Sequence, residues 1–210
     1  MRLRNVKNSW EKMLESKYIV ENPIENKGKW ANVFKNDHPI HIEIGMGKGQ
    51  FLLTMAEKYP DINFIGIEKY SSVLLRATEK ANEKDLNNLL FICMDAKEIA
   101  DVFAHEISVI YLNFSDPWPK MRHAKRRLTS PLFLSLYDDI FKDEKHIIQK
   151  TDNLALFAYS LEELSKHGYV LERVSLDLAN DNIINVLTEY EEKFHSLGYK
   201  ICYVEAIKKE

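Results

Sequence analysis

The chain has 210 residues, of which 45% are hydrophobic and 29% are charged, and its formal net charge is −3 at pH 7. This length suits one domain with short appendages, and the composition is ordinary for a soluble globular protein. No apolar run approaches the roughly 18 residues of a membrane helix, and no apolar segment follows the basic start, so neither a membrane span nor a secretory signal is expected. The two cysteines, Cys93 and Cys202, form no pair motif, which fits a reducing, cytoplasmic setting.

The negative net charge argues mildly against a nucleic-acid partner, but the positive charge is clustered. Residues 120–127 read KMRHAKRR, with five formal positive charges and no acid. The first twelve residues add four basic side chains against one glutamate. A nucleic acid responds to such patches rather than to the average charge, so RNA remains a possible partner.

Along the chain, residues 1–37 fit no repeating unit, and we expect an N-terminal arm with a short helix around Trp10 to Leu14. From residue 38 to residue 210, β-rich apolar runs alternate with helical periodicity, which indicates a single domain. The runs expected to form strands are 40–44, 63–67, 89–94, 107–113, 145–149, 169–176 and 200–207.

Three connections in the second half carry further expectations. Ser130 followed by Pro131 is typical of a helix start, and that helix is expected to bury Leu132, Leu136 and Ile140. Residues 142–145 are expected to form a turn before the fifth strand, although they lack the glycines that such turns often have. One helix is expected near 188–196, between the last two strands.

Alternation of strands and helices predicts parallel strands, right-handed crossovers and helices on both faces of the sheet. The last two strands lie further apart in sequence, which favours an antiparallel addition at the sheet edge. We therefore expect an α/β, Rossmann-like fold with a seven-stranded, mostly parallel sheet and an antiparallel edge strand.

Four successive strands deliver a carboxylate to their carboxyl ends. In an open parallel sheet, ligands bind beyond these ends. The acids at these positions are Glu43, Glu68, Asp95 and Asp116. Because the four strands are expected to be parallel, these side chains should meet along one edge of the sheet.

The first strand runs into a glycine turn, E-I-G-M-G-K-G, which contains Gly45, Gly47 and Gly49. Glycine permits positive φ and lets the backbone pass close to a ligand. Such a turn alone is equally well a tight connection without a ligand. Glu68 lies 19 residues past Gly49, where a carboxylate can accept hydrogen bonds from ribose hydroxyls. The pair favours a nucleotide-like ligand.

Two cofactor classes share this arrangement. A dinucleotide turn reads G-x-G-x-x-G, whereas the spacing here is G-x-G-x-G. Glu43 would repel a pyrophosphate, but it suits a ligand that carries an amino group and a sulfonium. Asp95 is placed to accept a hydrogen bond from an adenine amino group, or else to cap the helix that follows. The set resembles the class I S-adenosylmethionine methyltransferases, and a nicotinamide-dependent oxidoreductase is the alternative enzyme.

The most informative segment is 113–127, N-F-S-D-P-W-P-K-M-R-H-A-K-R-R. Its two prolines stiffen the backbone, and Trp118 offers a flat face on which a purine can stack for about 1–3 kcal/mol. Asp116 can accept hydrogen bonds from the Watson–Crick edge of guanine, and the basic run can hold phosphates. The alternatives are that the Asp-Pro-Trp-Pro turn is purely structural and that the basic run is a solvated surface. The turn and the basic run are adjacent at the expected ligand edge, however, and this favours a binding role.

With this segment the chain resembles the bacterial tRNA (guanine-N7-)-methyltransferases over nearly its whole length. The matching stretches are KGKW at 27–30, IEIGMGKGQF at 42–51, GIEK at 66–69, YLNFSDPWPK at 111–120, KTDN at 150–153 and TEYEEKF at 188–194. The resemblance implies transfer of a methyl group from S-adenosyl-L-methionine to N7 of a guanosine in the tRNA variable loop. A non-catalytic RNA-binding protein on the same fold is the alternative outside the enzymes.

The resemblance also implies roles for residues. The four carboxylates line the cofactor pocket, and Asp116 is in addition the catalytic position. The positions expected to contact the substrate are Lys120, Asp152, Thr188, Glu189, Tyr190 and Glu191. Those expected to contact RNA are Arg122, His123, Ala124, Lys125, Arg126 and Arg127. Asp152 also fits a helix cap, and Thr188 with Glu191 fits a capping box, T-x-x-E.

The partner expected from this reading is tRNA, held in a salt-sensitive way by the basic run. Neutralising Arg126 and Arg127 is expected to flatten the salt dependence of binding by about one to two units. No membrane and no metal are expected, since the histidines lack ligand spacing. A monomer and a homodimer both remain open.

Overall fold

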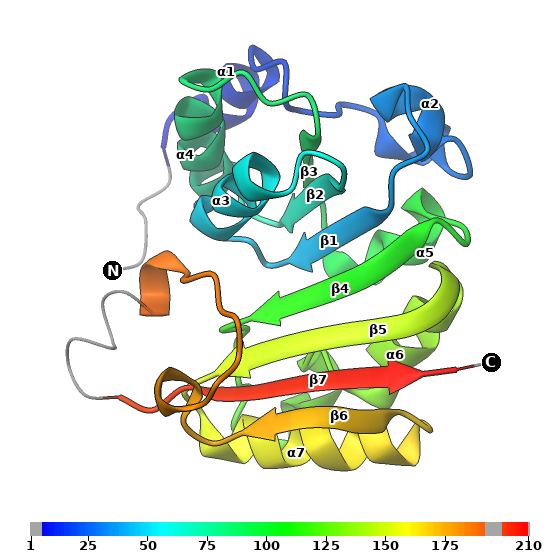
Figure 1. Cartoon of the computed structure of the whole chain (residues 1–210). Coiled ribbons are helices and arrows are strands. Elements are labelled where there is room, and N and C mark those ends of the chain that lie inside the picture. Colours follow the sequence, from blue (N-terminus) through cyan, green and yellow to red (C-terminus); the bar gives the residue numbers. More distant parts are fainter. Residues whose placement is uncertain (1–5, 192–198, 210) are drawn as a thin grey trace.

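The computed structural model describes residues 6–191 and 199–209, and a seven-stranded sheet runs through its centre (Figure 1). The strands are β1 (Ile40–Ile44), β2 (Asn63–Glu68), β3 (Leu89–Cys93), β4 (Ile107–Asn113), β5 (Phe141–Thr151), β6 (Val170–Ser175) and β7 (Cys202–Lys208). Each of the seven expected runs overlaps one of these strands, so the alternation predicted the strands in the right places.

The strand order is β3-β2-β1-β4-β5-β7-β6. Strands β1 to β5 pair in parallel, and β7 pairs antiparallel with both β5 and β6. The mostly parallel sheet with antiparallel pairing at its edge is therefore confirmed. The antiparallel strand β7 is inserted one place in from the edge, which β6 forms. Between β1 and β4 the order of connections reverses, and ligands bind at such a switch point.

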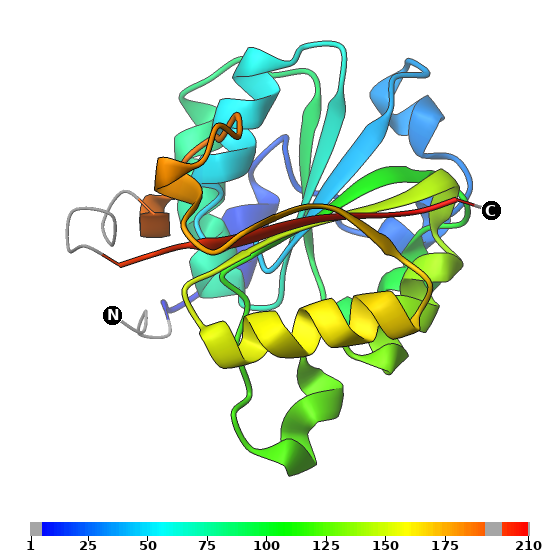
Figure 2. The same ribbon diagram turned by 60° about the horizontal axis from the view of Figure 1, so that its bottom comes forward.

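Helices cover both faces, as expected. The α-helices are α1 (Ser9–Leu14), α2 (Trp30–Phe34), α3 (Gln50–Lys58), α4 (Ser71–Asn82), α5 (Ile99–Val102), α6 (Pro131–Asp138) and α7 (Leu154–Lys166). The 3-10 turns are η1 (Pro23–Asn26), η2 (Ala96–Glu98), η3 (Met121–Arg126) and η4 (Leu178–Asn180). One apolar cluster joins the sheet to α2, α5, α6 and α7, and a second joins the other face to α1, α3 and α4 (Figure 2).

The N-terminal segment packs on this core. Its helix α1 lies where the short helix was expected, against α4. The backbone that follows runs beside β3. There the Phe91 N–H donates to the Tyr18 carbonyl at 2.7 Å, and the Val20 N–H donates to the Phe91 carbonyl at 3.0 Å. Trp30 is fully buried and its Nε1 donates to the Val102 carbonyl at 3.0 Å. That residues 1–37 form an N-terminal arm distinct from the domain stays a prediction. The described part of this segment, from residue 6, packs against the sheet and its helices.

The expected turn at 142–145 was wrong, because these residues belong to β5. The pairing of β5 with β4 passes from Phe141 opposite Ile107 to His146 opposite Val109. The extra residues on β5 form an irregular bulge, which explains why no glycine turn is needed. This bulge lies at the start of β5, at the edge of the sheet opposite the carboxyl ends of the parallel strands.

Helix α6 begins at Pro131 with Ser130 at the N-cap, as predicted, but the Ser130 hydroxyl donates to the Lys125 carbonyl at 3.2 Å. Of the three side chains expected to be buried, Ile140 is buried and Leu136 is half-buried, but the prediction was wrong for Leu132, which is 47% exposed. The buried side chains within the helix are Phe133, Leu134 and Tyr137. The helix expected near 188–196 lies for the most part in 192–198, outside the described residues.

Candidate active site

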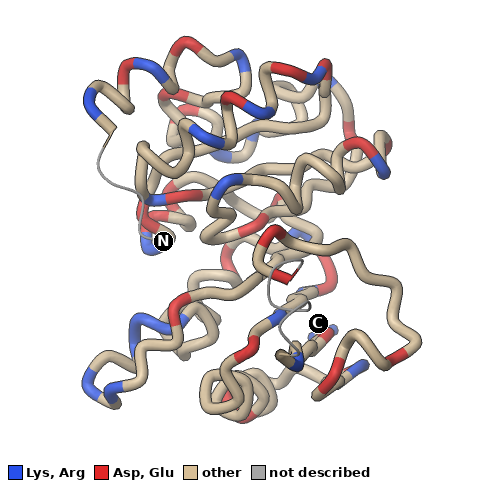
Figure 3. Tube along the Cα trace, turned by 90° about the vertical axis from the view of Figure 1, so that its left-hand side faces the viewer, with Lys and Arg blue, Asp and Glu red and all other residues tan. Residues whose placement is uncertain are grey.

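The carboxyl ends of β1 to β5 lie together on the left of Figure 1, and Figure 3 looks onto that edge. A cleft of about 560 Å³ opens there, a size within the range of small-molecule sites. Three predicted carboxylates line it, namely Glu68, Asp95 and Asp116. Its apolar wall is made by Ile44, Ile67, Val73, Met94, Leu128 and Phe133. Four carboxylates were expected to meet at one ligand edge; Glu68, Asp95 and Asp116 line this cleft, whereas Glu43 is absent from its lining.

Glu68 ends β2 as a nearly buried side chain whose two oxygens are both oriented by the backbone. One accepts from the Gly47 N–H at 3.2 Å and the other from the Tyr70 N–H at 3.1 Å. Burial raises the pKa of Glu68, and the negative charge of Asp116 acts in the same direction. A carboxylate has about four acceptor positions, so Glu68 keeps acceptor capacity for hydroxyl donors in the cleft.

Asp95 has a partner within the protein. Its carboxylate pairs with the Lys69 ammonium at 2.7 Å and also accepts from the Lys97 N–H at 3.1 Å. The hydrogen bond from Lys69 lowers the pKa of Asp95, although partial burial opposes it. The capping interpretation of Asp95 is thus confirmed for η2. A cofactor contact is compatible with it, because Asp95 also lines the cleft.

The glycine turn adopts positive φ at all three glycines, as the sequence indicated. Only Gly45 lines the cleft, and its N–H donates to the Ile67 carbonyl at 2.8 Å. Gly47 contributes the N–H that orients Glu68. A Cβ on Gly49 would lie 2.9 Å from the Ala77 Cβ, so that glycine permits α3 to pack against α4. The three glycines therefore have different tasks.

Glu43 lies behind the cleft rather than in its lining. It is 2% exposed, and its Oε1 accepts from the Asn113 amide at 2.8 Å. Burial raises the pKa of Glu43 to about 8, against the opposing effects of Asn113 and the Lys150 charge. Within the described chain, three buried oxygens here have no hydrogen-bond partner: Glu43 Oε2, Asn113 Oδ1 and Ser115 Oγ. Unpaired buried acceptors of this kind suit a ligand that brings N–H donors.

Asn113 and Ser115 were not proposed as site residues from the sequence. The signal was available, because both stand in the segment between β4 and Asp116 that was recognised as informative. Residues two apart on a strand share a face, so Tyr111 and Asn113 point to the same side as Glu43.

The loop after β4 has a constrained backbone. Phe114 and Trp118 both have positive φ, at 51° and 41°, which is uncommon for residues with a Cβ. Arg127 holds this conformation: its Nε donates to the Pro117 carbonyl and its Nη2 to the Trp118 carbonyl, both at 3.1 Å. Its guanidinium also lies over the Tyr159 ring, 4.2 Å from the centroid. Arg127 is 7% exposed.

The expectation that Arg127 contacts RNA is therefore corrected. Its guanidinium is buried against the carbonyls of the Asp-Pro-Trp-Pro turn and is not available to phosphates. The exposed basic side chains of the run are Lys120, Arg122, Lys125 and Arg126, while His123 and Ala124 are half-buried. The run forms η3 on a segment that projects from the body, shown green at the bottom of Figure 2 and rich in Lys and Arg in Figure 3.

The face of Trp118 that was expected to receive a purine has a neighbour. The Arg126 guanidinium lies 4.8 Å from the Trp118 ring centroid, and the His123 ring meets it edge-on at 5.9 Å. Both Trp118 and Arg126 line the cleft. The stacking of a purine on Trp118 stays a prediction. Arg126 lies beside Trp118 in the lining of the cleft.

The expected substrate residues do not form a single contact set. Thr188 and Glu191 are buried and form the predicted capping box, in which the Thr188 N–H donates to Glu191 at 2.9 Å and the Glu191 N–H donates to Thr188 at 3.0 Å. Glu189 pairs with Lys48 at 3.3 Å and also with Lys80. Lys120 is exposed at the start of η3.

Asp152 was also considered as a cap for α7, and that was wrong. The cap is Asn153, whose side chain accepts from the Leu156 N–H at 2.8 Å. Asp152 instead accepts from the Tyr190 hydroxyl at 3.0 Å. This contact brings Asp152 and Tyr190 together, two of the residues expected to contact substrate.

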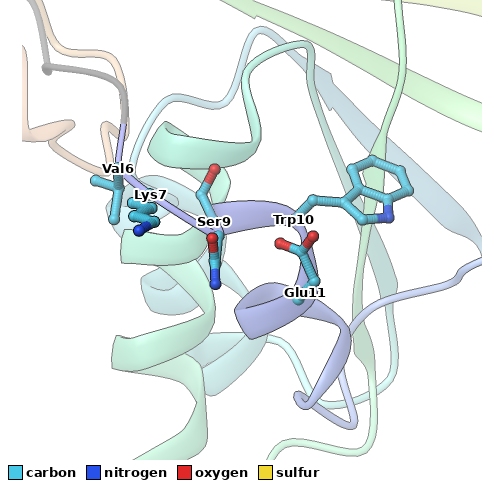
Figure 4. A pocket seen from close by; sticks show the side chains of 6 residues that line it. Val6, Lys7, Ser9, Trp10 and Glu11 are labelled. Atoms are coloured by element: carbon cyan, nitrogen blue, oxygen red, sulfur yellow. The ribbon is translucent and has the colours of Figure 1, made fainter.

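A second hollow of about 450 Å³ lies on the N-terminal segment and is lined by six consecutive residues, 6–11 (Figure 4). Trp10 points away from Val6 and Lys7 in this view, and it is about half exposed. Because one stretch of chain forms the whole lining, the hollow lacks the converging groups of a binding site.

In the described part of the chain, no helix is both long and apolar enough to cross a membrane. Among the same residues, no group of three or more His, Cys, Asp or Glu side chains is arranged to hold a metal ion.

Comparison with known proteins identifies the family. The chain matches the family described as "Putative methyltransferase" over residues 37–204. It is 51% identical to a tRNA (guanine-N(7)-)-methyltransferase of Lachnoclostridium phytofermentans, over 100% of both chains. It is 53% identical to one of a Geobacillus species, over 98% of this chain and 94% of that one. A solved antibiotic-related methyltransferase has the same fold, with a TM-score of 0.65 and 20% identity over 87% of this chain and 94% of that one. The chain belongs to the family of tRNA (guanine-N(7)-)-methyltransferases, on a class I methyltransferase fold.

Proposed function

We propose that the protein transfers the methyl group of S-adenosyl-L-methionine to N7 of a guanosine in the variable loop of tRNA, giving N7-methylguanosine and S-adenosylhomocysteine. Membership in the family supports the reaction. The observation in the structure that carries it is the single cleft at the switch point, which joins Glu68, Asp95 and the loop of Asp116. An oxidoreductase is disfavoured, because the glycine turn has the spacing G-x-G-x-G rather than the dinucleotide spacing G-x-G-x-x-G.

The cleft fits this cofactor. Glu68 keeps acceptor positions for the two ribose hydroxyls, and the apolar side chains around Ile67 and Met94 suit a planar base. The unpaired oxygens of Glu43, Asn113 and Ser115 suit the amino group of the methionine part. When bound, the cofactor supplies an electrophilic methyl group on a positive sulfonium.

The protein's own task is mainly alignment. Guanine N7 has an in-plane lone pair and carries no proton, so a general base is not needed for the attack. Holding the base in line with the methyl group can contribute several kcal/mol, and we assign this positioning to the loop of Asp116 and Trp118. Positive charge moves onto the purine as the bond forms, and the Asp116 carboxylate would stabilise it.

The proposal is tested by incubating unmodified tRNA with the protein and cofactor and analysing the nucleosides. We expect N7-methylguanosine from the variable loop only when the protein and S-adenosyl-L-methionine are both present. Thermal unfolding with S-adenosylhomocysteine or NAD supplies a second measurement, with stabilisation expected for the first alone. A protein that binds tRNA but leaves every guanosine unmethylated would support the non-catalytic alternative. A monomer or homodimer is compatible with the proposal.

The exposed basic side chains of η3 should carry part of the tRNA affinity. Replacing Arg122 and Lys125 with glutamine removes two charges and should lower the slope of log K against log salt by about 1.5 units. The matched control, Lys142→Gln with Lys209→Gln, makes the same charge change at the opposite edge of the sheet and should leave the slope unchanged. Equal slopes in the two double variants would remove η3 from the RNA interface.

A further inference from the structure

One buried lysine joins the carboxyl edge of the sheet to the segment 185–191, which lies above it (orange in Figure 1). Lys150 is the last residue but one of β5 and is 3% exposed. Its Nζ donates to Asn185 Oδ1 at 2.6 Å, to the Val186 carbonyl at 2.8 Å and to Glu191 Oε2 at 3.0 Å. A lysine ammonium has three N–H donors, and here all three are used.

Glu191 is the other centre of this network. Its Oε1 accepts from the Asn185 amide at 2.8 Å, and its Oε2 accepts from both Lys150 and the Thr188 N–H. The network is therefore closed, and its members already bond to one another rather than facing a ligand. What they determine is the shape of segment 185–191 and its place on the sheet.

The segment in this position contacts both the loop after β4 and the glycine turn. Tyr190 donates to Asp152, and its ring lies 4.6 Å from the ring of Phe114, which lines the cleft. On the other side, Glu189 pairs with Lys48, the residue between two glycines of the turn. The glycine turn and the loop of Asp116 are thus connected through two neighbouring residues.

Lys150 is joined to the loop through its backbone as well. Its carbonyl accepts from the Phe114 N–H at 2.9 Å, where the loop leaves β4 with positive φ. One residue therefore holds the loop by its main chain and segment 185–191 by its side chain. Its ammonium also lies 5.2 Å from the Phe51 ring centroid, so the side chain is fixed from the α3 side.

We propose that Lys150 is a positioning residue for methyl transfer, which acts through Glu191 and Asn185 to hold Tyr190 and Glu189 against the loop of Asp116 and the glycine turn. The inference rests on the proposed function, because the catalytic effect presumes transfer to a tRNA base. Lys150 itself touches neither substrate nor cofactor, since its three donors are satisfied within the protein.

The experiment compares Lys150→Met with Lys145→Met. Lys145 lies on the same strand, is mostly buried and pairs with Asp138 at 2.6 Å, but it stands at the opposite edge of the sheet. We expect Lys150→Met to lower kcat/KM for tRNA about tenfold or more, and Lys145→Met to change it less than about threefold. Hydrogen exchange of the amides 185–191 should accelerate about tenfold in Lys150→Met alone.

A merely structural lysine would not give the coupling expected with Tyr190. Tyr190→Phe removes the hydroxyl that reaches Asp152 and should lower kcat/KM about fivefold in the wild-type background, but less than about twofold beside Lys150→Met. Additive losses would overturn the inference, because Lys150 would then act independently of the segment. Unchanged kcat/KM in Lys150→Met would overturn it as well.

Lys150→Met leaves the Glu191 charge buried without its partner, which is costly to the fold. The variant Lys150→Met with Glu191→Gln removes both charges, and it should remain folded while keeping the low kcat/KM and the fast exchange. Wild-type kinetics in this double variant would contradict the inference. If the wild-type protein itself methylates no tRNA, the proposed function is wrong, and the exchange comparison alone still decides whether Lys150 positions the segment.

Discussion

Asp116→Ala is expected to lower kcat for tRNA methylation by about a hundredfold or more while leaving the folded state intact. Asp116 is exposed at the rim of the cleft, so its removal leaves no buried group unsatisfied. A hundredfold loss corresponds to about 2.7 kcal/mol of transition-state stabilisation, which is the size expected for losing one charged group that aligns a base and faces developing charge. The rate is measured with saturating cofactor, and folding by thermal unfolding.

Two further variants sharpen this test. Asp61→Ala removes an exposed aspartate before β2, at the opposite edge of the sheet, and should leave both the rate and the melting temperature as in the wild type. Asp116→Asn keeps an acceptor oxygen but removes the charge. If it is as slow as Asp116→Ala, the charge is what matters, and if it recovers most of the rate, positioning of the base dominates. Normal turnover in Asp116→Ala would remove Asp116 from catalysis.

The sheet was the most predictable part of the molecule. Runs such as 107–113 are apolar and β-branched, and in a parallel sheet they are buried on both faces, so the pattern is strong and short. The insertion of β7 between β5 and β6 was not predictable in the same way. Its position follows from pairing between residues far apart in sequence, such as Thr151 with Cys202, and no local pattern records that choice.

The candidate site was predictable to the extent that topology places residues. Glu68, Asp95 and Asp116 line one cleft because parallel strands end at one edge. The basic run was harder to interpret, since nothing in K-R-R says which side chain turns inward. Arg127 does so because the carbonyls of Pro117 and Trp118 need donors. Lys150 was missed for a similar reason, because its partners lie 35 to 41 residues away.

Glu43 should make cofactor binding depend on pH and release a proton. Burial raises its pKa to about 8 in the protein without cofactor, so at pH 7 it is mostly neutral. A positive amino group beside its unpaired Oε2 would favour the carboxylate, so the proton must leave on binding. The other groups that act on Glu43 are Asn113 and Lys150, which favour ionisation, and Glu68 and Glu191, which oppose it. The affinity should therefore rise as the pH increases toward about 8 and then level off.

Titration calorimetry with S-adenosylhomocysteine in buffers of different ionisation enthalpy measures this proton. We expect release of about one proton at pH 7 from the wild type and about none from Glu43→Gln, whose affinity at pH 8.5 should fall about tenfold or more. Glu98→Gln, an exposed change on η2 near the cleft, should behave as the wild type.

Glu43 also affects the stability of the protein without cofactor. Because the pKa of Glu43 is raised in the folded state, its contribution to the free energy of unfolding is complete below about pH 4.5 and is lost as the pH rises toward 8. Glu43→Gln should therefore show a smaller loss of stability between these pH values. In the calorimetric experiment, the same number of protons released by the wild type and by Glu43→Gln would exclude Glu43 as the group that contacts the amino group of the cofactor.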